Sequence, residues 1–223
     1  MERVRAAIER RGVLGLAQES LTRAVHGVHR HEQHIWYDLR VADVPAVSSF
    51  DAPLQLCLAS PDQLSLTEAV GRSALDARVW HGRGHHLWLV LDGATVAFAC
   101  WIFRGRTPVH AARGGWLALP EDTVCLEHSI TAPAYRGLGI APRAWMQIAN
   151  HLAGEGLATM ITKVETDNVA SRKAVGKAGF REIATQRFDR VGRRVSVSVE
   201  AIDTHRASAL RDQLETARSW RGS

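Results

Sequence analysis

The sequence predicts a mixed α/β fold, in which one sheet holds both parallel and antiparallel strands and helices pack against its faces. From residue 54 onward, short apolar strands alternate with helical segments, and two pairs of strands are joined by tight turns. Strands connected through a crossover helix run parallel, whereas strands connected by a tight turn run antiparallel. Because the chain contains both kinds of connection, we expect one mixed sheet.

The first part of this domain is predicted to hold a strand, a helix and a hairpin. Residues 54–58 alternate leucine with other residues, as a strand does. Ser60 then has the features of a helix N-cap, with Gln63 as its capping-box partner. Two apolar runs within 85–103 surround Asp92-Gly93, a dipeptide typical of hairpin turns.

The second part is predicted to alternate strands and helices before a final hairpin. The shorter helix is expected to end at Gly179, because glycine is favoured just past the end of a helix. The predicted elements are a strand at 123–131, a helix at 139–153, a strand at 158–165, a helix at 168–178, and hairpin strands at 180–189 and 193–202.

The two ends of the chain are assigned separately from this domain. Residues 1–50 are predicted to form an N-terminal, mainly helical extension, because apolar residues recur at roughly helical spacing over 2–28. Within this extension, 34–41 alternates as a strand does. Residues 51–202 are expected to form the main domain, and 203–223 a C-terminal helix or tail.

The composition favours one globular domain with an appendage. Hydrophobic residues make up 46% of the 223 residues, but no apolar run is long enough to span a bilayer. The N-terminal residues lack the apolar segment of a signal peptide. Cys57, Cys100 and Cys125 are an odd number in apolar surroundings, which predicts reduced thiols in a cytoplasmic protein. Neither a disulfide framework nor a metal site is expected, and the histidines within 26–34 are interpreted as part of a surface turn.

The formal net charge of +5 favours an anionic partner. The arginines are scattered, without a block of five or more, and no nucleic-acid recognition motif accompanies them. Nucleic acid is therefore not expected, whereas a small phosphorylated ligand accounts for the charge.

The segment YRGLGIA at 135–141 carries the strongest chemical signal. It follows a predicted strand and opens a predicted helix, whose free N–H groups and partial positive charge attract phosphate. Gly137 and Gly139 allow the backbone to close around an oxyanion, and Ala141 keeps the approach open. Arg136 adds a forked, permanently charged donor. A glycine-rich turn that binds nothing is the alternative interpretation.

Two segments resemble the GNAT superfamily of N-acetyltransferases, which use acyl-coenzyme A. PAYRGLGIA at 133–141 resembles the motif [Q/R]-x-x-G-x-[G/A] of this superfamily. DNVASRKAVGKAGF at 167–180 resembles the N-x-x-S…K-x-G-F segment of the branch related to ribosomal-protein N-acetyltransferases. The resemblance extends over about residues 54–200, and it implies the GNAT fold.

The resemblance also implies a binding site for acetyl-CoA or another acyl-CoA. The amides at the start of the helix would hold the pyrophosphate, the preceding strand would pair with the pantetheine arm, and the next helix would face the sulfur. Arg143, Arg172 and Lys173 are either outlying phosphate contacts or solvated helix residues. The residues implied in donor binding are Ser129, Ile130, Thr131, Arg136, Gly137, Leu138, Gly139, Ile140, Ala141, Asn168 and Ser171.

Catalytic roles are implied for two residues. Glu127 stands where many members of the family carry an acidic residue that takes the proton of the amine, and an apolar strand around it favours this role. His128 is the second candidate for the base, but its side chain is expected to point to the opposite face. Val175 stands where many members carry a tyrosine, so Ser171 becomes the candidate donor of a proton to the thiolate.

These features predict a GNAT-type acyltransferase that moves an acyl group, most simply acetyl, from acyl-CoA to a primary amine by direct transfer and without a metal. The expected acceptor is a small-molecule amine or a protein N-terminus. No membrane partner is expected, and a homodimer is compatible with the sequence. The alternative is a catalytically degenerate domain that binds coenzyme A and acts as a regulatory or scaffold module.

Overall fold

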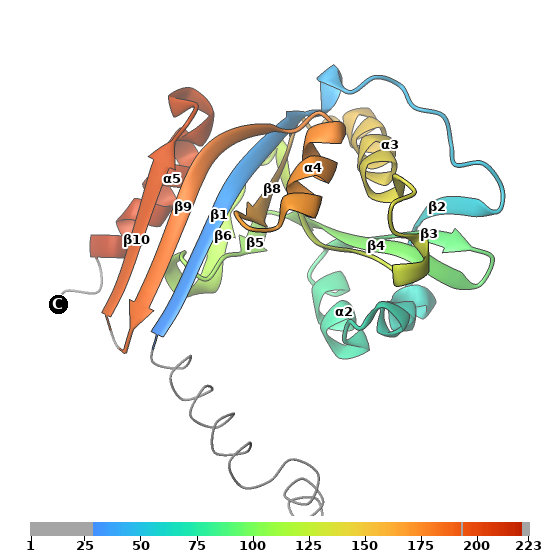
Figure 1. Ribbon diagram of the computed structural model, residues 1–223, viewed down its shortest axis with the longest axis horizontal. Helices are drawn as coiled ribbons and strands as arrows, with labels where there is room; N and C mark the ends of the chain where they lie inside the picture. The colour runs from blue at the N-terminus through green and yellow to red at the C-terminus, as the bar shows by residue number, and fades with distance from the viewer. Residues whose placement is uncertain (1–28, 193, 220–223) are drawn as a thin grey trace, which may run out of the picture.

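The computed structural model describes residues 29–192 and 194–219, and its main feature is one eight-stranded sheet (Figure 1). The strands lie in the order β10-β9-β1-β8-β7-β4-β3-β2. β7 and β8 are parallel, and the other neighbouring pairs are antiparallel, so the predicted mixed sheet is confirmed. The strands are β1 (His29–Arg40), β2 (Leu54–Leu58), β3 (His86–Asp92), β4 (Thr95–Arg104), β7 (Thr123–Thr131), β8 (Thr159–Glu165), β9 (Arg181–Val191) and β10 (Arg194–Ala201).

Each face of the sheet has its own cover and its own hydrophobic core (Figure 1). Successive side chains of a strand point to opposite faces, so on β7 Leu126 joins one core and Cys125 the other. The Leu126 face is covered by α3 (Ile140–Gly154) and α4 (Val169–Lys177). The Cys125 face is covered by the 3-10 helix η2 (Pro61–Val70), α2 (Ala74–His81), the hairpin of β5 (Arg106–Pro108) and β6 (Trp116–Ala118), and α5 (Thr204–Ser219).

Most elements after residue 54 lie where the sequence predicts them. β7 spans the predicted strand, and α3 and α4 each lie within one residue of their predicted bounds. Gly179, with φ of +93°, follows α4 as expected. The backbone N–H of Ser60 donates to Oε1 of Gln63 at 3.0 Å, as a capping box requires. The helical segment after β2 is divided into η2 and α2, because Gly71 adopts a left-handed conformation between them.

The structure corrects the assignment of residues 1–50 as a mainly helical extension. Residues 29–40 form β1, which lies inside the sheet and pairs with β8 on one side and β9 on the other. The domain therefore begins before residue 51, and the histidines at 29, 31 and 34 belong to a strand rather than to a surface turn. The predicted helix over 2–28 lies outside the described residues.

Trp36 anchors β1 to the rest of the domain. Its side chain is fully buried, and its indole Nε1–H donates to Oε1 of Gln186 on β9 at 2.8 Å. The helix predicted at the C-terminal end is present as α5, which packs on the same side of the sheet. No helix among the described residues is both long enough and apolar enough to cross a bilayer.

We expect Trp36→Ala to lower the free energy of unfolding by about 3–5 kcal/mol, because it removes a large buried ring from the core. Trp36→Phe should cost about 1–3 kcal/mol, because it leaves the buried amide of Gln186 without its donor. Urea denaturation of the full chain measures both values, with Arg40→Ala at the exposed end of β1 as the control. An unchanged stability of Trp36→Ala would show that β1 does not belong to the cooperative unit.

Candidate active site

β7 and β8 separate in the middle of the sheet, and this separation creates the candidate site. Their pairing ends at Cys125 opposite Ile161. Just beyond that point, Oγ1 of Thr162 donates to the carbonyl oxygen of Leu126 at 2.7 Å and closes the end of the gap that adjoins the paired part of the strands. From Glu127 onward, β7 is paired with β4 alone. An opening between two neighbouring parallel strands exposes backbone and side chains of both to a ligand.

A β-bulge in β7 lies beside this opening. Cys100 of β4 faces both His128 and Ser129, and His128 has a φ of +53°. A bulge bends its strand and changes the alternation of side chains. The imidazole of His128 consequently stacks on Trp80 at 4.7 Å between ring centroids, on the Cys125 face of the sheet, where Glu127 also lies. The expectation that His128 points away from the face of Glu127 is therefore wrong.

A groove of about 610 Å³ runs from the opening along the start of α3. It brings together most of the residues that the sequence implied in donor binding, from three separate elements. Leu138 is the exception, because it does not line the groove and its side chain is 66% exposed. The predicted residues that line the groove are Ser129, Ile130, Thr131, Arg136, Gly137, Gly139, Ile140, Ala141, Asn168 and Ser171.

The first turn of α3 presents free amides to this groove. Gly139 is the N-cap with a φ of +72°, and no side chain of the described residues caps the helix there. Gly137 is also left-handed, with a φ of +80°. A Cβ atom at either glycine would meet no atom within 4 Å, so the space over both is open. Ile140 is buried below them and fixes the helix start against the core.

The charged side chains that line the groove, Arg136, Lys173 and Lys177, are all cationic. Lys177 is a residue that the sequence analysis missed. Arg143, by contrast, lies outside the lining, since it donates to Oγ of Ser48 at 3.1 Å and packs over the ring of Phe50.

Arg172 also lies outside the lining of the groove. It donates to the carbonyl oxygen of Thr166 at 3.1 Å and lies 3.5 Å from Glu182. Of the three outlying candidates for phosphate contacts, Lys173 alone faces the groove.

A second cavity of about 310 Å³ adjoins the groove at the separated strands. The two share four lining residues, Ser129, Trp145, Asn168 and Ser171, and therefore border one another. Titratable side chains line the second cavity: His34, Glu127, His128, Lys163 and Glu165. Both predicted catalytic residues, Glu127 and Ser171, are therefore brought to this cavity.

The start of α4 positions Ser171 at the junction of the two spaces. Oδ1 of Asn168 accepts from the backbone N–H of Ser171 at 3.1 Å, which makes Asn168 the N-cap of α4. Val175 lines the second cavity from the next turn. Neither tyrosine of the chain replaces it, because Tyr37 donates to Glu182 at 3.1 Å and Tyr135 donates to Asp92 at 2.8 Å.

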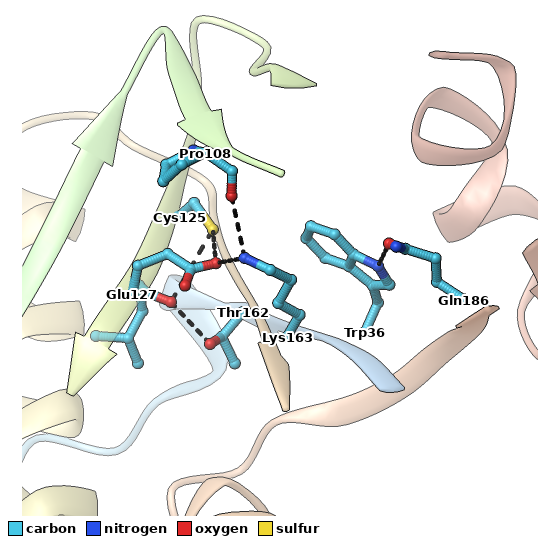
Figure 2. A network of polar contacts seen from close by, with 8 residues as sticks. Trp36, Pro108, Cys125, Glu127, Thr162, Lys163 and Gln186 are labelled. Atoms are coloured by element: carbon cyan, nitrogen blue, oxygen red, sulfur yellow. Dashed lines mark hydrogen bonds and ion pairs between the residues drawn. The ribbon is translucent and has the colours of Figure 1, made fainter. Parts of the chain in front are cut away.

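Glu127 is held in an ion pair rather than in an apolar setting. Figure 2 shows Lys163 reaching from β8 to the carboxylate of Glu127, and Nζ of Lys163 lies within hydrogen-bond distance of Oε1. Nζ also donates to the carbonyl oxygen of Pro108 at 3.2 Å and lies 5.5 Å from the ring centroid of Trp36. The thiol of Cys125 lies 3.7 Å from Oε1. The side chains of Glu127 and Lys163 are only 11% and 14% exposed.

Burial and charge act in opposite directions on the groups of this cavity. Burial, the largest single effect, lowers the pKa of Lys163, but Glu127 and, to a smaller extent, Cys125 and Glu32 together raise the pKa above its ordinary value. Burial and, to a smaller extent, nearby cations lower the pKa of both His34 and His128. Nδ1 of His34 and Nε2 of His128 are buried without a partner among the described residues. Burial therefore favours the neutral form of both rings.

Lys163 and His34 were not singled out as site residues from the sequence. Each is brought to the cavity by pairing between distant strands, since Lys163 lies opposite Trp36 and His34 opposite Glu165. Lys163 sits in a predicted strand with no motif around it. His34 was visible only as one of several histidines.

A separate cavity of about 700 Å³ lies under α5, at the other end of β8. Its wall includes Leu117, Ile183 and Leu210, together with the ion pair between Asp38 and Arg206. None of the predicted donor-binding or catalytic residues lines it. The groove and the adjoining cavity at the separated strands are therefore the candidate site.

A comparison with protein families supports the assignment made from the motifs. The model of the acetyltransferase (GNAT) family matches residues 58–180, which is more than half of the chain. The chain therefore belongs to the GNAT family of acetyltransferases. Both motif segments lie within the match, whereas β1 lies before it. No curated protein matches the sequence.

Solved structures with the same fold include two bacterial acetyltransferases. A GNAT-family acetyltransferase from Colwellia psychrerythraea has a TM-score of 0.51 and 21% identity, over 85% of this chain and 63% of that one. A GCN5-related N-acetyltransferase from Sphaerobacter thermophilus has a TM-score of 0.51 and 10% identity, over 83% of this chain and 56% of that one. The chain thus spans less than two thirds of the length of these proteins, and the similarity confirms the fold.

We expect His34 and His128 to titrate below 6.5 in the folded protein, because burial disfavours the charged ring of each. The unfolded chain takes up these protons at higher pH, so the stability that the neutral rings contribute is present above pH 6.5 and is lost as the pH falls through their folded pKa values. Carbon NMR of labelled histidine rings measures the midpoints, with His34→Asn and His128→Asn for assignment. The same rings in urea should return to about 6.5. A folded midpoint at or above that value would contradict the burial of the ring concerned.

Proposed function

We propose that this protein is an acyl-CoA-dependent N-acyltransferase that transfers an acyl group, most simply acetyl, directly to a primary amine. The observation that carries the proposal is the separation of β7 from β8, where a cationic groove borders the cavity that Glu127 lines. Membership of the acetyltransferase family supports the same reaction class.

The groove fits the donor in charge and in shape. Uncapped amides at the start of α3 and left-handed glycines above open space suit a diphosphate, which needs several N–H donors at close approach. Arg136, Lys173 and Lys177 supply the positive charge that a phosphorylated ligand requires. The strand edge at 129–131, unpaired toward β8, offers hydrogen-bonding groups to an extended amide-containing arm.

The adjoining cavity suits the acceptor amine. Glu127 provides a carboxylate that attracts an ammonium group and accepts its proton, after which the neutral amine attacks the carbonyl carbon of the thioester. The C–N bond forms as the C–S bond breaks, the nitrogen loses a second proton as the amide forms, and the departing thiolate takes up one proton, so that a group which donates to sulfur regains its proton from the nitrogen. The hydroxyl of Ser171, at the junction of groove and cavity, is the proposed donor of that proton, while Val175 cannot supply one.

The acceptor is proposed to be a small-molecule amine or a protein N-terminus. A cavity of about 310 Å³ matches the end of either kind of substrate. The N-x-x-S segment at 168–171 resembles that of the branch related to ribosomal-protein N-acetyltransferases. The amines tested should therefore include a protein N-terminus. The free thiols of Cys57, Cys100 and Cys125 suit a reducing, cytoplasmic setting.

We expect Glu127→Gln to reduce kcat/KM for acetyl transfer by about 10²–10⁴-fold, because the amide cannot accept the proton of the amine. Release of free thiol from acetyl-CoA over a panel of amines and N-terminal peptides measures the rate. Glu121→Gln, at an exposed position before the same strand, is the matched control and should leave the rate unchanged. If the wild type binds acetyl-CoA but acylates no amine, the chain is a binding module and not an enzyme.

We expect Gly139→Ala to raise the Kd for acetyl-CoA at least about tenfold, which corresponds to about 1.4 kcal/mol. The new methyl group would stand in the open space where the diphosphate is proposed to bind, and alanine disfavours the left-handed backbone. Calorimetry measures the Kd. Gly154→Ala, at the other end of α3 and also facing open space, should bind like the wild type. Equal affinities of all three proteins would remove the start of α3 from the donor site.

A further inference from the structure

Lys163 is the least expected feature of the candidate site. A lysine is rarely buried unless it is paired, and the side chain of Lys163 is only 14% exposed. It approaches Glu127 from β8, across the gap where the two strands are no longer paired. A cation of the chain itself therefore lies beside the carboxylate that is proposed to meet the acceptor amine.

Three contacts from different elements fix this lysine. Its ammonium touches the carboxylate of Glu127 and donates to the carbonyl oxygen of Pro108 in β5 at 3.2 Å. The indole of Trp36 on β1 lies 5.5 Å from Nζ, so the stem and the charge both have packing partners (Figure 2). A side chain held on three sides has little freedom to swing out of the cavity.

The charges around the pair come from every strand that borders it. Cys125, Glu127 and His128 lie on β7, Glu165 lies two residues after Lys163 on β8, and Glu32 and His34 lie on β1. Glu32 is itself paired with Arg30. Among the residues that the structure describes, Lys163 is the one ammonium or guanidinium group that lines this cavity. Without it, the largely buried carboxylate of Glu127 would have no permanent positive charge among the described lining residues.

We propose that Lys163 is a positioning residue that keeps the carboxylate of Glu127 ionised and in place for the incoming amine. This inference rests on the proposed function, and it adds a residue that positions the proposed base of the same site. A neighbouring ammonium favours the ionised form of a carboxylate, whereas burial favours the protonated form. A protonated Glu127 cannot accept the proton of the amine, so Lys163 extends the activity to lower pH.

The test compares pH profiles of kcat/KM for acetyl transfer in four single variants and two double variants of the full chain. Lys163→Gln keeps a hydrogen-bond donor for Glu127 and Pro108 but removes the charge, and Lys163→Met keeps the stem against Trp36. With either neutral side chain, the acidic limb of the profile should move to higher pH by about one unit or more. Lys163→Arg retains the charge and should leave the limb within about half a unit of the wild type.

Double variants that combine a Lys163 substitution with Glu127→Gln distinguish this role from a merely structural one. Lys163→Gln and Lys163→Met should each change the residual rate of Glu127→Gln little and shift no limb, because the group on which Lys163 acts is gone. Binding of acetyl-CoA, measured by calorimetry, shows that each variant is folded. The side chains of the two neutral variants differ in shape. If one variant fails to fold, the pH profile of the other still tests the proposal.

Two results would overturn the proposal. One is an acidic limb that stays in place in a folded neutral variant, and the other is the same shift in the background of Glu127→Gln. A wild type that acylates no amine would instead overturn the proposed function on which the inference rests. A wild type that is active, with an unmoved limb in Lys163→Gln or Lys163→Met, would overturn the inference alone.

Discussion

The early end of the pairing between β7 and β8 is the constraint on which the site depends. Where two parallel strands remain paired, their facing N–H and C=O groups are used up and no ligand can enter between them. Here the ladder stops at Cys125, and the hydroxyl of Thr162 donates to the carbonyl oxygen of the next residue, Leu126. The bulge at His128 bends β7 beyond that point, so the opening is built into the backbone and does not rely on flexible loops.

The two ends of this opening differ in charge. Toward the start of α3, the charged lining residues among those described are all cationic, and the helix adds its partial positive charge. On the opposite side, the described lining carries two carboxylates, one ammonium and two imidazoles. If the proposed function holds, a phosphorylated donor and an amine acceptor would be attracted to different ends. The ion pair of Glu127 and Lys163 lies at the second of these ends.

The sequence predicts well what is encoded locally and poorly what depends on pairing between distant strands. Periodicity, caps and glycines located the elements after residue 54, and two motifs pointed to residues that the structure brings to one groove. The place of β1 in the sheet was missed, because nothing within 29–40 indicates which strands it will join. Lys163 was missed for the same reason, since its partner Glu127 lies on another strand. The orientation of His128 followed from a bulge that alternation cannot reveal.

The position of β1 has a consequence for how the chain acquires its structure. β1 leaves the ribosome before any of its partners, and Trp36 hydrogen-bonds to a residue 150 positions later in the chain. The centre of the sheet cannot close until β8 and β9 have been synthesised, so the apolar residues of β1 lack their partners until then. Pairing between strands so distant in the sequence slows folding. The order of the strands thus delays the burial of Trp36 until the last partner of β1 has been made.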